Sequence, residues 1–296
     1  MTRFINHWSK GSYGPKEVAQ ALLLMVLFFF LGNLPASLVF AHYGISNLFD
    51  AEKQIGFYRL FMLQMFPFVA VLVAFFLVGL KIHKVQWLDW ITQRSKPSWK
   101  KMGLAFALWS VFLTITFFFQ WLLAPENLRW NFQPIPFFGA LVLLIGMLPL
   151  QVLAEELLFR SYALQGLTAR TKKPWLAVLI SGLMFGFMHL GNPEVKEYGV
   201  LILVLYSALG IFLSLMTALD GGIEIAFGFH LANNLSSGLL VTSKEQALQI
   251  PALFSTDSGS LDAQGMLLLL LGLVLFFIVF RRLYAWRVGS LMQNIP

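Results

Sequence analysis

Residues 18–43 read VAQALLLMVLFFFLGNLPASLVFAHY and contain no Asp, Glu, Lys or Arg. A helix needs about 20 mostly apolar residues to cross the hydrocarbon core of a bilayer, so this run is long enough for a membrane-spanning helix. The rest of the chain has the same character, because 58% of its 296 residues are hydrophobic and only 12% are charged. A soluble domain carries about 25% charged residues. We therefore predict an all-α integral membrane protein.

Seven further stretches also lack these four charged residue types. With the first, the predicted spans are residues 18–43, 60–80, 102–125, 130–154, 174–193, 198–219, 225–243 and 263–280. This pattern predicts a polytopic bundle of about eight transmembrane helices. Lys and Arg gather in alternate connections, which the positive-inside rule places in the cytoplasm. We therefore expect both termini to be cytoplasmic.

The spans suggest three parts. They are residues 1–130 with the first three helices, residues 131–243 with a core of four helices, and residues 244–296 with a loop, the last helix and a tail. Segment 81–101, between the second and third spans, places Trp87, Trp90 and Trp99 among basic residues. Such a segment is either a helix lying in the membrane interface or a plain loop with interfacial aromatics.

Composition also excludes several partners and chemistries. The chain has no cysteine, so disulfides, thiolate metal sites and a Cys nucleophile are excluded. Its Lys and Arg residues are spread among the connections and form no basic stripe, so we expect no nucleic-acid partner. The expected partner is the lipid bilayer.

The sequence AEELLFR, residues 154–160, places three charges in an apolar stretch. Charged groups at membrane depth are costly, so each one needs a partner or a task. Glu156 and Arg160 are four residues apart, share a helix face and can neutralise each other. Glu155 points about 100° away on the helix and lacks that partner. We interpret Glu155 as a candidate general base.

Of the five histidines, His7, His42 and His83 lie near span ends or in loops, whereas His189 and His230 lie in the fifth and seventh predicted spans. His189 follows Phe185 by four residues, and His230 precedes Asn234 by four residues. Residues four apart lie on one helix face, so His230 and Asn234 can face a common point. Together with Glu155, these polar groups predict a catalytic centre inside the membrane.

Arg170 and Lys173 lie in the basic connection between the fourth and fifth predicted spans. A count of residues from this connection tests whether Glu155 and His189 lie at the same depth in the membrane. Glu155 lies fifteen residues before Arg170, roughly 22 Å along a helix. His189 lies sixteen residues after Lys173, roughly 24 Å along a helix. The two side chains reach the same level if the fourth helix continues past its charge-free window to about residue 169.

Other functions use the same residues. Glu155, His189 and His230 would suffice in number to hold zinc with an open position for water. Intramembrane charges also serve as proton or ion sites in transporters, although here none lies in the first half of the chain. A Glu–Arg pair can be only a buried salt bridge, and a non-catalytic immunity or scaffold protein could keep all of these residues.

The three motifs Glu155-Glu156-x-x-x-Arg160, Phe185-x-x-x-His189 and His230-x-x-x-Asn234 resemble those of the CPBP family of intramembrane proteases. That family includes type 2 CAAX prenyl endopeptidases and bacterial Abi proteins linked to bacteriocin processing or immunity. The resemblance covers roughly residues 135–242, and the motifs occur in the family's order on three predicted helices.

The resemblance implies an eight-helix intramembrane endopeptidase in the cell membrane of a bacterium. It implies that Glu155 and His189 activate a water, and that His230 and Asn234 stabilise the oxyanion. Glu156 and Arg160 would fix the orientation of the helices. The resemblance favours a glutamate-dependent enzyme without a cofactor, with zinc as the alternative. The expected substrate is a membrane-associated peptide or protein that is possibly lipidated.

Overall fold

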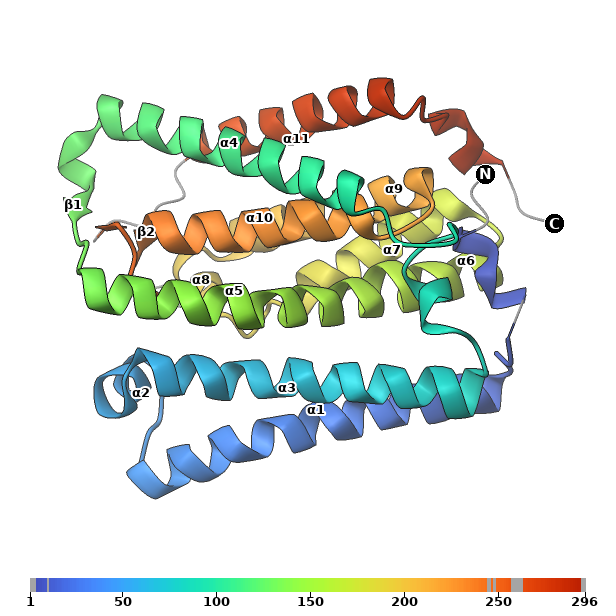
Figure 1. Cartoon of the computed structure of the whole chain (residues 1–296), viewed down its shortest axis with the longest axis horizontal. Coiled ribbons are helices and arrows are strands. Elements are labelled where there is room, and N and C mark those ends of the chain that lie inside the picture. The colour runs from blue at the N-terminus through green and yellow to red at the C-terminus, as the bar shows by residue number, and fades with distance from the viewer. Residues whose placement is uncertain (1–3, 10, 244–245, 247–248, 257–262, 294–296) are drawn as a thin grey trace.

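The computed structural model describes residues 4–9, 11–243, 246, 249–256 and 263–293. It is a bundle of helices that run along the long axis of the molecule (Figure 1). The long helices are α1 (Pro15–Tyr43), α3 (Phe57–Leu77), α4 (Trp99–Leu123), α5 (Pro134–Glu156), α7 (Pro174–Phe187), α9 (Val200–Asp220), α10 (Glu224–Leu240) and α11 (Ala263–Leu283). The predicted all-α polytopic class is confirmed.

Short elements join these helices. They are the 3-10 helices η1 (Phe4–Ser9), η3 (Trp87–Trp90), η4 (Pro125–Asn127) and η6 (Val288–Met292), the π-helices η2 (Val78–His83) and η5 (Leu157–Ala163), and the helices α2 (Leu48–Ile55), α6 (Leu164–Thr171) and α8 (Pro193–Tyr198). Three two-residue strands form a small sheet in the order β1-β3-β2. In it β1 (Arg129–Trp130) is antiparallel and β2 (Val241–Thr242) parallel to β3 (Phe254–Ser255).

Each of the eight predicted windows overlaps one of the long helices. Among the described residues, six helices are long and apolar enough to cross a membrane. The other two, α7 and α10, are shorter, with 14 and 17 residues. The chain is therefore an integral membrane protein, while the count of eight and the cytoplasmic termini stay predictions.

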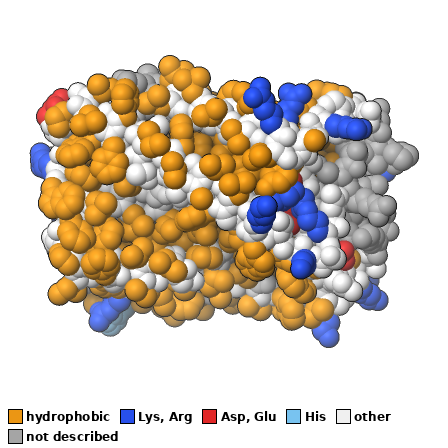
Figure 2. Space-filling model, turned by 45° about the horizontal axis from the view of Figure 1, so that its top comes forward, with side chains coloured by type: hydrophobic (Ala, Val, Ile, Leu, Met, Phe, Trp, Pro, Cys, Tyr) orange, Lys and Arg blue, Asp and Glu red, His pale blue; other side chains and the backbone are white. Residues whose placement is uncertain are grey.

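The outer surface has the character that a lipid solvent requires. Large apolar side chains are exposed along the long helices, for example Leu23 at 70% and Phe30 at 66% of their full area. On the face drawn in Figure 2, hydrophobic side chains cover most of the surface. Most Lys and Arg side chains on this face lie toward the right-hand end, where Figure 1 shows both termini.

The fourth predicted span continues beyond its charge-free window, as expected. Helices α5, η5 and α6 form one uninterrupted helical stretch, Pro134–Thr171, of 38 residues. The π-helical part begins at Leu157, directly after the two glutamates. Single π-helical turns are rare in proteins, and those that occur are often found at functional sites. The continuous helix therefore carries Glu155 and Glu156 in its interior.

Segment 81–101 is ordered without being an interfacial helix. Between His83 and Trp99 its only helix among the described residues is η3, which has four residues. Of the two alternatives left open by the sequence, the structure fits the plain loop and not the helix lying in the interface. The segment is held instead by contacts with the helices around it, including an isolated β-bridge between Thr92 and Gly222. These contacts replace the regular hydrogen bonds that a helix would supply.

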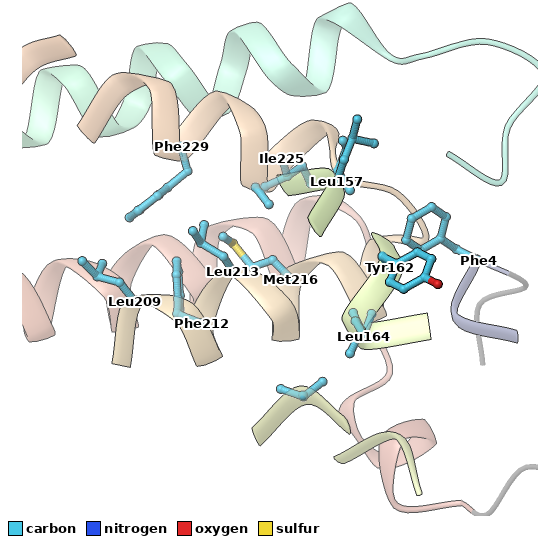
Figure 3. Close-up of a cluster of buried hydrophobic side chains, with 14 of the residues drawn as sticks. Phe4, Leu157, Tyr162, Leu164, Leu209, Phe212, Leu213, Met216, Ile225 and Phe229 are labelled. Carbon is cyan, nitrogen blue, oxygen red and sulfur yellow. The ribbon is translucent and has the colours of Figure 1, made fainter. Parts of the chain in front are cut away.

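The interior around the later helices is apolar and closely packed. Figure 3 shows side chains from η1, η5, α6, α9 and α10 in one cluster, including Phe4, Tyr162, Met216 and Phe229. All four are less than 5% exposed. This packing surrounds the stretch that follows the glutamates and fixes its position against α9.

Helices α7 and α9 approach each other through glycines. A Cβ atom on Gly182 would collide with the backbone of Ile211, and one on Gly210 would collide with the carbonyl oxygen of Gly182. Small residues at such contacts allow helix backbones to come close in membrane proteins.

We expect Gly182→Val to lower the free energy of unfolding by about 1–3 kcal/mol, because the added methyl groups overpack this contact. Gly146→Val on α5 is the matched control, since a Cβ there has no neighbour within 4 Å. Thermal unfolding of both variants in detergent measures the difference. Equal stability of the two variants would contradict close packing of α7 on α9.

Candidate active site

One largely buried imidazole contacts two carboxylates on a neighbouring helix. Nδ1 of His230 on α10 lies 2.8 Å from Oε1 of Glu156, and Nε2 lies 3.5 Å from Oε2 of Glu155. The side chains of His230 and Glu155 are 7% and 15% exposed, and that of Glu156 is fully buried. The structure thus brings together Glu155 and His230, and it adds a direct contact between His230 and Glu156.

The predicted pair of Glu156 and Arg160 is confirmed. Arg160 Nε lies 3.4 Å from Glu156 Oε2, and both side chains are fully buried. The guanidinium carbon of Arg160 also lies 4.2 Å from the centre of the Phe185 ring, which is within the range of a cation–π contact. Both Arg160 Nη atoms are buried without a hydrogen-bond partner among the described residues. Burial of a guanidinium without hydrogen-bond partners costs free energy, and such a group within a membrane protein is typical of a functional centre.

Asn234 is aligned by polar neighbours on two helices. Its amide nitrogen donates to Oε1 of Gln151 over 3.3 Å, and its amide oxygen accepts from Asn233 Nδ2 over 3.4 Å. An amide nitrogen has two protons, so one N–H of Asn234 remains available to a further acceptor. Gln151 and Glu155 on α5 meet Asn234 and His230 in the opposite order on α10, so the two helices are antiparallel here.

Gln151 was missing from the predicted site. A sequence signal for it existed, because Gln151 is a polar residue in an apolar run and precedes Glu155 by one helical turn. Its role becomes visible only when α10 is placed beside α5.

His189 lies near this centre but belongs to a turn. Helix α7 ends at Phe187, so the prediction that His189 lies within the helix is wrong. Nδ1 of His189 lies 2.7 Å from the carbonyl oxygen of Phe185, and its ring stacks on Tyr206 with ring centres 4.2 Å apart. A carbonyl only accepts, so Nδ1 carries the proton and the lone pair of a neutral His189 is on Nε2.

The ring of Phe185 connects His189 to the rest of the centre. Its centroid lies 4.7 Å from the His189 ring and 5.7 Å from the His230 ring. In the part of the chain that the structure describes, His189 makes no hydrogen bond or ion pair with Glu155, His230 or Asn234. A meeting of His189 and Glu155 on one water therefore stays a prediction.

The proposed zinc ligands do not form a ligand set in this structure. Among the described residues, no three His, Asp or Glu side chains are grouped closely enough to hold a metal ion. Glu155 and His230 are close to each other, whereas His189 contacts neither of them. The residues that the structure describes here do not fit a zinc site.

The contacts of His230 define what the centre can do chemically. Glu156 faces Arg160 and is therefore a carboxylate that only accepts hydrogen bonds, so Nδ1 of His230 donates to it. In a neutral His230 the lone pair on Nε2 would then face an oxygen of Glu155. Nε2 of His230 and Oε2 of Glu155 are both acceptors when unprotonated, so they can lie 3.5 Å apart without repulsion if one proton is bound between them. The pair can thus hold one proton and transfer it, as general acid–base catalysis requires.

The helical bundle and its buried carboxylate–imidazole centre define a polytopic membrane protein with acid–base groups inside the bundle. Residues 136–236 match the family described as type II CAAX prenyl endopeptidase, Rce1-like. This match confirms the family resemblance predicted from the motifs. Glu155, His189, His230 and Asn234 all lie within the matched residues.

A curated relative gives a second comparison. The chain is 30% identical over 172 residues to the uncharacterized protein YyaK of Bacillus subtilis (strain 168). The aligned part covers 57% of this chain and 58% of YyaK, so the chain matches a little over half the length of that relative. No solved structure matches the chain significantly.

Proposed function

We propose that the protein is an intramembrane endopeptidase of the CAAX protease type. It hydrolyses a peptide bond in a membrane-associated peptide or protein, and its natural location is the cell membrane of a bacterium. The observation that supports this proposal best is the environment of His230. Its Nδ1 contacts Glu156, and its Nε2 faces Glu155. The match of residues 136–236 to a family of prenyl endopeptidases supports the same activity.

The first half of the reaction adds water to the scissile carbonyl. Glu155 takes one proton from the water, and the water oxygen forms a bond to the carbonyl carbon. The negative charge that develops on the carbonyl oxygen is stabilised by Nε2–H of protonated His230 and by the free amide N–H of Asn234. His189 supports the water as an acceptor through Nε2 and helps to relay its proton.

The second half breaks the carbon–nitrogen bond. Protonated Glu155 returns its proton to the leaving nitrogen as this bond breaks, which gives a carboxylic acid and an amine. Arg160 lies beside Glu156 as its cationic partner, and Glu156 keeps the His230 ring turned toward Glu155. The orientation of a catalytic imidazole by a buried carboxylate follows the logic of other hydrolases.

We expect purified protein in detergent to cleave a farnesylated peptide with a C-terminal CAAX sequence, or a member of a library of membrane-associated peptides. Cleavage should survive treatment with a chelator, because the three candidate ligands do not form a metal site. Elemental analysis of the same sample provides the control. Stoichiometric zinc, with activity lost on its removal and restored on its return, would overturn the glutamate mechanism.

A further inference from the structure

The connection between η2 and α4 touches both helices of the candidate active site. We name residues 90–98 the bridging segment. One end of it contacts η5, which continues from the glutamates of α5, and the other end contacts the turn that starts α10. The bridging segment therefore contacts both the helical stretch that carries Glu155 and the start of the helix that carries His230.

Backbone contacts hold the bridging segment to the turn between α9 and α10. The amide of Gln93 donates to Gly221 O over 3.0 Å, and the amide of Ile223 donates to Ile91 O over 2.9 Å. Thr92 and Gly222 form a β-bridge between them. The turn is therefore paired with the segment as two short strands would be.

Arg94 adds a forked ion pair to this turn. Its Nη2 lies 2.6 Å from Oδ2 of Asp220, the last residue of α9, and its Nη1 lies 3.2 Å from both carboxylate oxygens of Glu224, the first residue of α10. Lys101 lies 2.5 Å from Asp220, so two basic groups meet two acidic groups. The Asp220 and Glu224 side chains are no more than 1% exposed, and such carboxylates need these partners.

The other end of the segment is tied to the glutamate helix. Ser161 Oγ donates a hydrogen bond to the carbonyl oxygen of Trp90. Ser161 directly follows Arg160, the partner of Glu156, on the π-helix. The Trp90 ring packs against Tyr162 with ring centres 6.5 Å apart. Movement of the segment relative to η5 would therefore break contacts next to the site.

We propose that Arg94 is a positioning residue that sets the distance between His230 and the two glutamates. Glu224 and His230 lie on α10 within two helical turns of each other. A displacement of the α9–α10 connection would therefore move the imidazole of His230. The planar guanidinium can bond the two carboxylates at once in fixed directions, whereas a lysine ammonium cannot reproduce this fork. Its catalytic consequence rests on the proposed endopeptidase function.

The test compares Arg94→Lys with Arg282→Lys, an exposed arginine at the end of α11 that makes no ion pair among the described residues. The absence of native cysteine allows one spin label on α5 at Ile145→Cys and one on α10 at Ser237→Cys. Both positions are exposed. Double electron–electron resonance then reports the distance between the helices, kinetics report kcat and KM, and thermal unfolding reports stability.

We expect Arg94→Lys to broaden or shift the distance distribution and to lower kcat about tenfold to a hundredfold with little change in KM, because small misplacements of catalytic groups are costly. Arg282→Lys should change neither quantity. A fall in kcat with an unchanged distance distribution, or an altered distribution with normal kcat, overturns the proposal. If Arg94→Lys does not fold, Glu224→Gln tests the same fork with the same criteria.

Failure of the proposed function gives a different result. If the unmodified protein cleaves no peptide, the distance measurement alone decides. An unchanged distribution in Arg94→Lys then overturns the positioning role, and a changed one supports it independently of catalysis.

Discussion

The Glu155→Gln variant is expected to cleave peptides about 10²–10⁴ times more slowly than the unmodified protein, which is the usual contribution of a general base. Gln has nearly the shape of Glu but cannot take a proton from water. The Glu155 side chain is 15% exposed and its contact with His230 is 3.5 Å long, so the substitution should leave the fold intact. Initial rates of both proteins, with matched thermal unfolding, measure the effect.

A control for this variant is Glu126→Gln, which changes an exposed carboxylate in η4. It should cleave at the normal rate. Cleavage by Glu155→Gln at the same rate would contradict the role of Glu155 as the base. A cellular effect of the protein that persists in Glu155→Gln would favour a non-catalytic immunity or scaffold function.

The second large effect concerns stability. Arg160→Met is expected to lower the free energy of unfolding by about 3–5 kcal/mol, because it leaves the carboxylate of Glu156 buried without its cation. The double variant Glu156→Gln with Arg160→Met removes both charges and should lose much less, since a buried ion pair can often be replaced by neutral groups at little cost. Reversible unfolding in detergent measures the single and double variants together.

The difference in the free energy of unfolding between these variants separates the contribution of the ion pair from that of side-chain packing. Arg160 is fully buried and also contacts Phe185, so any substitution loses some contact area. A double variant as unstable as Arg160→Met would assign the loss to packing. A single variant within about 0.5 kcal/mol of the unmodified protein, the range of ordinary surface changes, would contradict the buried pair.

The sequence predicted features that depend on local periodicity. Runs free of charge located the long helices, and spacing by four residues predicted both the Glu156–Arg160 pair and the common face of His230 and Asn234. The apolar character of residues 157–167 predicted that the fourth helix continues to about residue 169, and in the structure it ends at Thr171. These features are determined by residues close together in the chain.

Other features depend on contacts between distant residues and could not be predicted in this way. Asp220 and Glu224 lie between the sixth and seventh predicted spans, and their partner Arg94 is more than a hundred residues away in the sequence. The end of α7 before His189 also has no local signal as clear as a proline. Charge counting located the basic connection around Arg94 but could not show that its side chain is directed into the protein.

The length of the helical stretch Pro134–Thr171 constrains how the candidate site can sit in a bilayer. At about 1.5 Å per residue its 38 residues extend over roughly 57 Å, nearly twice the thickness of the hydrocarbon layer. Such a mismatch requires a steep tilt or a protruding end. His230 lies only about 9 Å along α10 from Glu224, so on the predicted orientation the candidate site would lie toward the cytoplasmic end of α10. Under the proposed function, water would then have a short path to the reaction, and a substrate anchored in the inner leaflet would need little insertion to reach it.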